Sequence, residues 1–239
     1  MSTLKPIRSI SLKDRAVSSV RDAIFNGDLA PGDPLRELHL AKELRISQPT
    51  VREALMELER HGLVVRRPNI ETTVTNFTKQ DISDRLELRL LLEKTAIRKA
   101  AQRITVADLA EFDVRLGAIA AAVAANNYHL AAAADLAFHR YIWECSGNNA
   151  LAGGLDCVCT PLFAFISVLR STVAEDLANL VPAHAELIQV IRSHDEAQMD
   201  LSLEKHIMSS YQAFLDSPSE DCRTHLKQLR LRKAQSASN

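Results

Sequence analysis

The chain has 239 residues, of which 46% are hydrophobic and 25% charged, with a net charge of −1. This composition is typical of a soluble protein with one large domain or two smaller ones. The sequence has no run of about 18 apolar residues and no apolar signal core near its start, so we expect a cytoplasmic protein with no membrane partner. The spacing of its four cysteines fits neither a disulfide framework nor a four-thiolate zinc site.

The first predicted helix covers residues 12–25. Pro31-Gly32 then predicts a type II turn, because glycine tolerates the positive φ that this turn requires. A second helix follows. The helical spacing of Leu38, Ala41 and Leu44 predicts that these three residues form its buried face.

The third predicted helix follows Ser47, a residue type that caps helix N-termini well. Pro49 lies in its first turn, where the missing N–H costs nothing. Gly62 ends this helix, and two short strands at residues 63–65 and 72–74 enclose a basic turn. A helix, a turn, a second helix and a two-stranded wing make up a DNA-binding head. The predicted buried face of the third helix is Val51, Ala54, Leu55 and Leu58.

The start of this third helix is the predicted DNA-reading surface. In helix-turn-helix proteins, residues there contact base edges, where glutamine pairs with adenine and arginine with guanine. The alternative is a helical hairpin in an all-α domain, but the cap and the wing favour DNA binding. Residues 1–76 carry 12 basic and 10 acidic residues, so we expect modest non-specific affinity and a dependence on dimerisation. The predicted DNA contacts are Ser47, Gln48, Thr50, Arg52, Arg66, Arg67 and Asn69.

The rest of the chain predicts an all-α antiparallel bundle, so the fold class is mostly α. We assign residues 1–76 to the winged helix-turn-helix domain, 77–217 to the bundle, and 218–239 to a polar tail with at most one short helix at about 222–231. Pro161 is expected to kink the fourth bundle helix and Pro182 to disturb the fifth. The six bundle helices are predicted at about 79–101, 106–125, 128–145, 148–173, 174–193 and 197–215.

Four residues of the bundle suggest a metal site. Asp135 and His139 lie four residues apart on one helix and share a face, while His184 and His206 fall on later helices. Three neutral imidazoles and one carboxylate suit Zn²⁺, and also Ni²⁺ or Mn²⁺. The alternative is that His139 is a core histidine and that the other residues lie on the surface. Spacing alone leaves both interpretations open.

The head resembles the winged helix-turn-helix of the GntR transcription regulators. The resemblance is carried by Pro31-Gly32, Leu40-Ala41, Ser47, Val51-Arg52-Glu53-Ala54-Leu55, Leu58, Gly62-Leu63-Val64 and Arg66-Arg67. The bundle resembles the effector domain of the FadR branch, the FCD domain in its VanR-like six-helix form. That resemblance is carried by Arg89 with Leu92-Glu93, Asp135 with Phe138-His139, Ser146-Gly147-Asn148, His184 and His206. Together the two cover nearly all of residues 12–215.

The resemblance implies a homodimeric repressor that binds a palindromic operator and a small organic acid. It implies a divalent metal, with zinc preferred, held by Asp135, His139, His184 and His206. Arg89 becomes the candidate partner of the effector carboxylate, because a guanidinium binds a carboxylate through two parallel hydrogen bonds. The alternative for Arg89 is an ordinary helix-surface ion pair with Glu93.

Two positions depart from the family pattern. The family usually has arginine directly after the capping serine, where this chain has Gln48, so we expect a different operator sequence or a lower affinity. The wing usually turns on a glycine, where this chain has Asn69-Ile70-Glu71. An acid near phosphates and a turn without its permissive residue put wing contacts to the minor groove in doubt.

We therefore predict a ligand-responsive transcription regulator, a repressor of an operon for the catabolism of a small organic acid or sugar acid. Two other functions compete with this one. A metal-dependent enzyme in a helical bundle would need a general base or a nucleophile, and the sequence shows no motif for either. A DNA-binding protein that ignores small molecules would not need a polar constellation inside its bundle.

Overall fold

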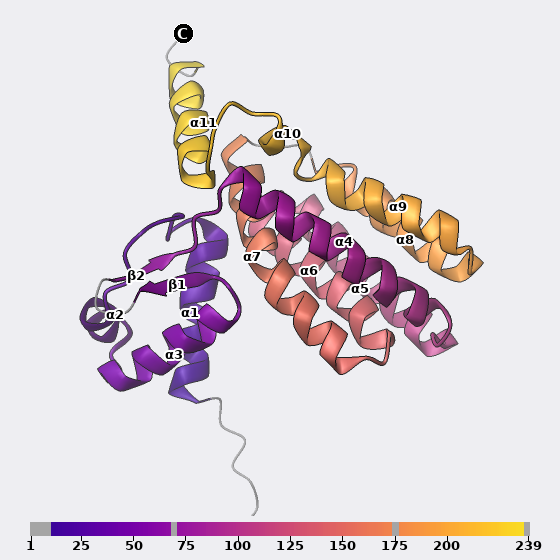
Figure 1. The fold of residues 1–239 in the computed structure, drawn as a ribbon, viewed down its shortest axis with the longest axis horizontal. Helices are drawn as coiled ribbons and strands as arrows, with labels where there is room; N and C mark the ends of the chain where they lie inside the picture. The colour runs from indigo at the N-terminus through magenta and orange to yellow at the C-terminus, as the bar shows by residue number, and fades with distance from the viewer. Residues whose placement is uncertain (1–10, 68–70, 174–176, 237–239) are drawn as a thin grey trace, which may run out of the picture.

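The computed structural model describes residues 11–67, 71–173 and 177–236, and it confirms a mostly α fold. Figure 1 shows a small head with a two-stranded sheet beside a bundle of long helices, with the last helix lying over the junction. The head consists of α1 (Leu12–Asn26), α2 (Glu37–Leu44), α3 (Gln48–Arg60), β1 (Val64–Arg67) and β2 (Glu71–Val74). The two strands are antiparallel, with Val64 opposite Val74 and Arg67 opposite Glu71.

The predicted turns and caps of the head are present. Gly32 has a φ of +79°, and the backbone N–H of Asp33 donates to Ala30 at 3.0 Å, which closes the turn before α2. Ser47 caps α3, and its Oγ accepts from the backbone N–H of Thr50 at 3.3 Å. The buried face of α3 is as predicted, with Val51, Ala54, Leu55 and Leu58 all at most 2% exposed.

The predicted buried face of α2 was wrong at one position. Leu38 is 60% exposed, whereas Leu40 and Ala41 are buried, with Leu44 packed partly against the core. In a helix of only eight residues, the apolar side chains can be assigned to two overlapping faces, one starting at Leu38 and one at Leu40. Contact with α1 and α3 selects the stripe that starts at Leu40, which leaves Leu38 facing solvent.

The bundle contains the six predicted helices, with differences near its end. α8 begins at Leu180, so Pro182 lies in its first turn, where it removes no internal hydrogen bond. α9 ends at Ser209 and is followed by a short extra helix, and Pro161 lies inside one unbroken helix, α7. The helices are α4 (Lys79–Ala101), α5 (Val106–Ala124), α6 (Tyr128–Cys145), α7 (Asn149–Val173), α8 (Leu180–Ser193), α9 (Glu196–Ser209) and α10 (Gln212–Leu215).

α7 is the central helix of the bundle. Among the described helices it is the one whose length and apolar composition would suffice to cross a membrane, and 67% of its most apolar stretch is buried inside the protein. It packs against α4 and α6 in the bundle and against α1 in the head. Its apolar composition is therefore accounted for by contacts on several sides.

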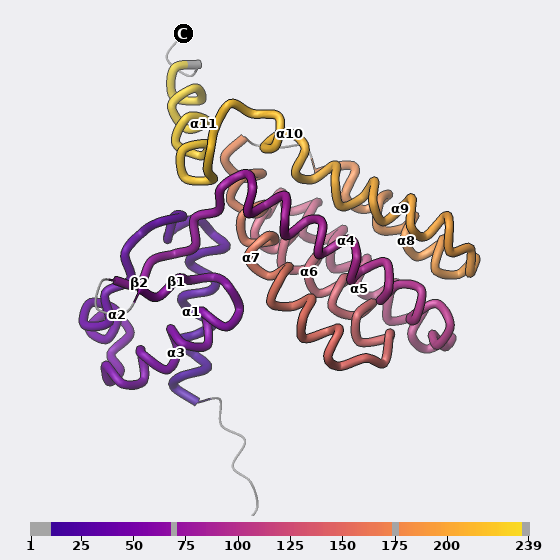
Figure 2. The backbone as a smooth tube through the Cα atoms, in the orientation of Figure 1, coloured from indigo at the N-terminus to yellow at the C-terminus, as the bar shows by residue number. Residues whose placement is uncertain are grey.

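The polar tail forms α11 (Cys222–Ser236), which is longer than the predicted short helix. The Arg223 guanidinium donates to the backbone oxygen of Gly32 in the head at 3.1 Å, and Cys222 N–H donates to Phe77 at 2.8 Å. Cys222 and Leu226 are buried. The backbone trace in Figure 2 shows how α11 returns from the far side of the bundle to the place where the head joins α4.

Candidate metal centre and DNA-reading surface

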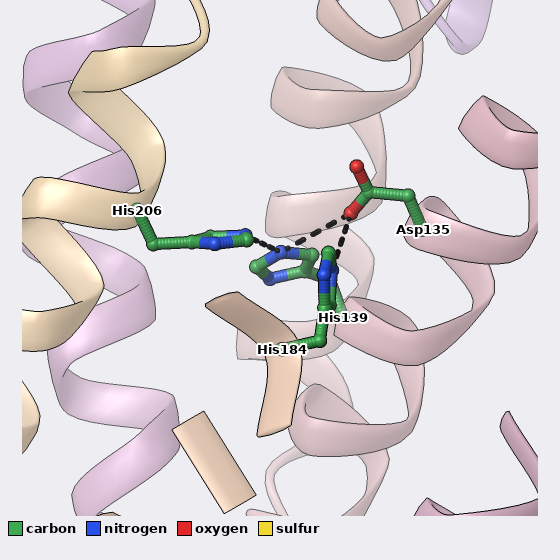
Figure 3. Close-up of side chains that lie close together, drawn as sticks. All are labelled: Asp135, His139, His184 and His206. Carbon is green, nitrogen blue, oxygen red and sulfur yellow. Dashed lines mark hydrogen bonds and ion pairs between the residues drawn. The ribbon is translucent and has the colours of Figure 1, made fainter. Parts of the chain in front are cut away.

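Asp135, His139, His184 and His206 converge at one point inside the bundle. Asp135 and His139 come from α6, His184 from α8 and His206 from α9, and one donor atom from each lies within 4.8 Å of all the others. His184 Nε2 is 2.9 Å and His139 Nε2 is 3.5 Å from Asp135 Oδ1. His139 Nε2 is 3.1 Å from His206 Nε2. Figure 3 shows the three rings and the carboxylate facing a common centre.

The outer ring nitrogens of two of these histidines already have hydrogen-bond partners. His184 Nδ1 is 2.7 Å from the backbone oxygen of Leu180, and His139 Nδ1 is 2.8 Å from the carboxylate of Glu93. Both partners are acceptors, so each Nδ1 can donate its proton outward when the Nε2 atom of the same ring binds a metal ion at the centre. This arrangement is the usual support of a metal-binding histidine.

Burial lowers the pKa of the third histidine, His206, well below its ordinary value, which favours the neutral imidazole that metal ions bind. His139 and His184 are fully buried, and Asp135 is 4% exposed. The alternative that places all of them but His139 on the surface therefore does not hold. Three neutral imidazoles and one carboxylate aimed at one point fit a divalent metal ion.

Arg89 does pair with Glu93, but inside the bundle and not on its surface. Arg89 Nε donates to Glu93 Oε1 at 2.6 Å, and both side chains are at most 3% exposed. Burial alone would raise the pKa of Glu93, but His139 and Arg89 outweigh it and hold that pKa well below the ordinary range. The guanidinium also lies 4.7 Å above the ring of Phe163. Arg89 thus fixes the carboxylate that orients His139.

A pocket of about 150 Å³ lies beside His206, one of the four converging side chains. Arg170 of α7 faces it, with Nη1 3.8 Å from Asp135 Oδ2 and Nη2 donating to Ser210 Oγ at 3.0 Å. Arg89 is not part of its lining, which consists of Arg170, Leu177, Asn179, Leu180, Ala183, His206, Ser209 and Ser210. Sequence analysis missed Arg170 and the role of Glu93. A single charged residue within the apolar stretch of α7 was the available signal for Arg170.

The predicted DNA contacts of α3 share one acidic partner that sequence analysis did not predict. Glu37 of α2 accepts hydrogen bonds from Arg52 Nε at 3.0 Å, from Arg52 Nη2 at 2.8 Å and from Gln48 Nε2 at 3.1 Å. Ser47 and Thr50 are joined by a 2.8 Å hydroxyl contact at the helix cap. Gln48 and Arg52 are therefore held side by side at the start of α3.

The wing arginines face acidic residues. Arg66 Nη1 is 3.7 Å from the Glu59 carboxylate of α3, and Arg67 lies opposite Glu71 across the two strands. Asn69, the remaining predicted contact, lies outside the described residues. The charge available to phosphates from the described part of the wing is therefore partly neutralised.

A DNA-binding head joined to an all-helical domain with a buried polar centre defines a transcription regulator with a sensor domain. Comparison with known families supports both halves: residues 12–74 match the bacterial regulatory proteins of the gntR family, and residues 84–209 match the FCD domain. The chain belongs to the GntR family and carries an FCD domain. It is therefore a transcription regulator and not an enzyme.

Several curated relatives and solved structures share this organisation. A probable D-xylose utilization operon repressor of Paenarthrobacter nicotinovorans is 26% identical over 80% of this chain and 84% of its own length. The regulator LutR of Bacillus subtilis is 27% identical over 77% of this chain and 92% of its own. Escherichia coli McbR/YncC has the same fold, with a TM-score of 0.73, 22% identity, and coverage of 86% of this chain and all of its own.

Proposed function

We propose that this protein is a cytoplasmic homodimeric repressor whose FCD domain senses a small carboxylate at a divalent metal ion. The observation that carries this proposal is the convergence of three imidazole nitrogens and one carboxylate within 4.8 Å. The outer ring nitrogens of His139 and His184 have the hydrogen-bond partners that usually support a metal ligand. Zn²⁺ suits this donor set best, and Ni²⁺ and Mn²⁺ are the alternatives.

Four protein ligands leave room for one or two further ligands when the coordination expands beyond four. The cavity beside His206 gives a small acid access to that position, and Arg170 offers a buried cation there. Arg89 acts in this proposal through Glu93 and His139, as part of the support of the centre. The relative named for a D-xylose utilization operon supports a role in catabolism, and we propose an operon for a small organic acid or sugar acid.

For DNA binding we propose contacts from Ser47, Gln48, Thr50 and Arg52 to a palindromic operator, assisted by Arg66, Arg67 and Asn69. The opposed acids at Glu59 and Glu71 make the wing a weaker contributor than the start of α3. A DNA-binding protein that ignores small molecules is the remaining alternative. The buried polar centre argues against it, because such a protein would not need three imidazoles and a carboxylate converging inside its bundle.

The test of the sensor site is its metal content. Elemental analysis of protein purified without chelators should find about one divalent ion per chain, and His184→Ala/His206→Ala should lose it. Retention of the full metal content by this double variant would refute the ligand set. A thermal-shift screen of mono-, di- and tricarboxylic acids and sugar acids on the metal-loaded protein then identifies the effector class, because a ligand stabilises the state that it binds.

A further inference from the structure

The recognition helix α3 ends directly on the bundle. Gly62, which follows the C-cap residue His61, has a φ of +69°. A Cβ atom at this position would lie 3.3 Å from Pro161 Cγ and 3.5 Å from the backbone oxygen of Cys157, both on α7. Only glycine combines this backbone conformation with so close an approach. The C-terminal end of α3 is therefore packed directly against α7.

A chain of charged side chains crosses the same contact. His61 Nδ1 is 3.2 Å from Asp156 Oδ2 of α7, and His61 Nε2 is 3.3 Å from Glu57 Oε1 of α3 itself. The ring thus lies within 3.3 Å of one carboxylate on α3 and one on α7. These three side chains are only 23–29% exposed, so water screens the contact less than it screens an open surface pair.

The other carboxylate oxygen of Asp156 contacts residues inside the bundle. Asp156 Oδ1 accepts from Arg140 Nε at 2.6 Å and from Thr160 Oγ1 at 3.1 Å. Arg140 directly follows His139, one of the four residues of the candidate metal centre. The connection from that centre to the recognition helix thus consists of one peptide bond, the Arg140–Asp156 ion pair and the 3.2 Å Asp156–His61 contact.

We propose that Arg140, Asp156 and His61 are positioning residues that couple the metal centre in the FCD domain to the orientation of α3. This proposal rests on the proposed sensor function. A change at the centre that shifts α6 against α7 would alter the Arg140–Asp156 pair, and the Asp156–His61 pair would pass the shift to the end of α3. Coupling between sites needs such a connection between elements that have two arrangements, and it is measured as a change of affinity at one site when the other is filled.

The test compares operator affinity with and without metal in matched variants. The probe is Zn²⁺ added to chelator-treated full-length protein, and the DNA is a fragment selected from random sequence by the wild-type protein. In the wild type, Zn²⁺ should change the operator Kd by at least about five-fold, the lower end of typical allosteric coupling. In Asp156→Asn that ratio should fall to within about two-fold of unity, with zinc binding itself unchanged.

The chain offers a closely matched control. Asp200 of α9 pairs with Arg98 of α4, and the side-chain exposures of 24% and 41% resemble the 23% and 37% of Asp156 and Arg140. This pair lies entirely within the bundle, away from the head. Asp200→Asn should therefore keep the zinc response of the wild type.

The outcomes separate the two proposals. A full zinc response in Asp156→Asn overturns the coupling role, as does a wild type that binds zinc without any change in operator affinity. A wild type that retains no divalent metal overturns instead the sensor function on which that role depends. His61→Gln changes the same contact from the side of the head, and it should lose the zinc response of the operator Kd to the same degree. The double variant His61→Gln/Asp156→Asn should be no worse than either single one, and His61→Lys, which restores a cation, should recover part of the response.

Discussion

Glu37 is an acidic side chain placed among groups that read DNA. Its contact with Arg52 lowers its own pKa, so it stays ionised while it accepts from both Arg52 and Gln48. Such a contact fixes the direction of a guanidinium before DNA arrives, which favours one base arrangement. It also places a negative charge near the phosphates, which weakens indiscriminate binding.

Glu37→Gln should therefore raise affinity for random DNA while lowering the ratio of specific to non-specific affinity. A bidentate base contact is worth about 1–3 kcal/mol of discrimination, so a loss of about ten-fold in that ratio is expected if Arg52 loses its orientation. Competition binding with random duplex measures it. The control is Glu43→Gln on the same helix, which removes the same charge from a side chain that contacts His39 of α2. An equal loss there would contradict the role of Glu37.

The two buried arginines of the FCD domain should differ in what they contribute. Arg170→Ala should weaken the response to the carboxylate identified by the thermal-shift screen by about ten-fold or more, the scale of a lost charge-assisted hydrogen bond, and leave metal content intact. Arg89→Ala should instead weaken metal retention, since Glu93 loses its partner and His139 its fixed orientation. Titration of both variants with metal and with the acid distinguishes these results, and a reversal of the two phenotypes would return Arg89 to direct effector contact.

At the scale of elements, features set by neighbouring residues were predictable and features set across the fold were not. The caps at Ser47, Thr78 and Thr105 depend on residues three positions away, so the sequence contains the whole motif. The buried face of α2 depends on which side meets α1 and α3, and prediction failed at Leu38 for that reason.

The same distinction holds for the candidate site. Asp135 and His139 share a helix, but their meeting with His184 and His206 is a property of the bundle, and spacing alone could not establish it. Glu37 lies 15 residues from Arg52. Asp156 lies far from His61 in the chain, and the predicted domain boundaries place Asp156 in the bundle and His61 in the head. No local sequence pattern indicates pairs of residues that lie so far apart in the chain.

The helix α11 should stabilise the junction between the head and the bundle. Leu226 is 3% exposed against this junction, so Leu226→Ala should lower the free energy of unfolding by about 2–5 kcal/mol. Leu231 is on the same helix but is 55% exposed, and Leu231→Ala should have little effect. Denaturant unfolding of the two variants makes the comparison, and equal stabilities would show that the contact contributes nothing.

At the scale of the whole molecule, the proposed metal ties together three bundle helices, α6, α8 and α9. Removing it should therefore lower the melting temperature of the entire protein. A free metal concentration of 100 times its Kd contributes about 2.7 kcal/mol, which corresponds to a shift of about 5–10 °C for a chain of this size. Thermal unfolding with and without chelator measures the shift. The variant His184→Ala/His206→Ala should show none, and a chelator effect of the same size in that variant would assign the shift to another cause.

The position of α11 has a genetic consequence. A frameshift or stop codon just after the codon for Ser217 would leave every proposed metal ligand and every proposed base-reading residue in place. It would still remove the Arg223 contact to Gly32 and the buried side chains of Cys222 and Leu226. A selection for colonies that have lost repression should therefore recover stop codons between the codons for Ser217 and Ser236, a region that the matched family domains do not include.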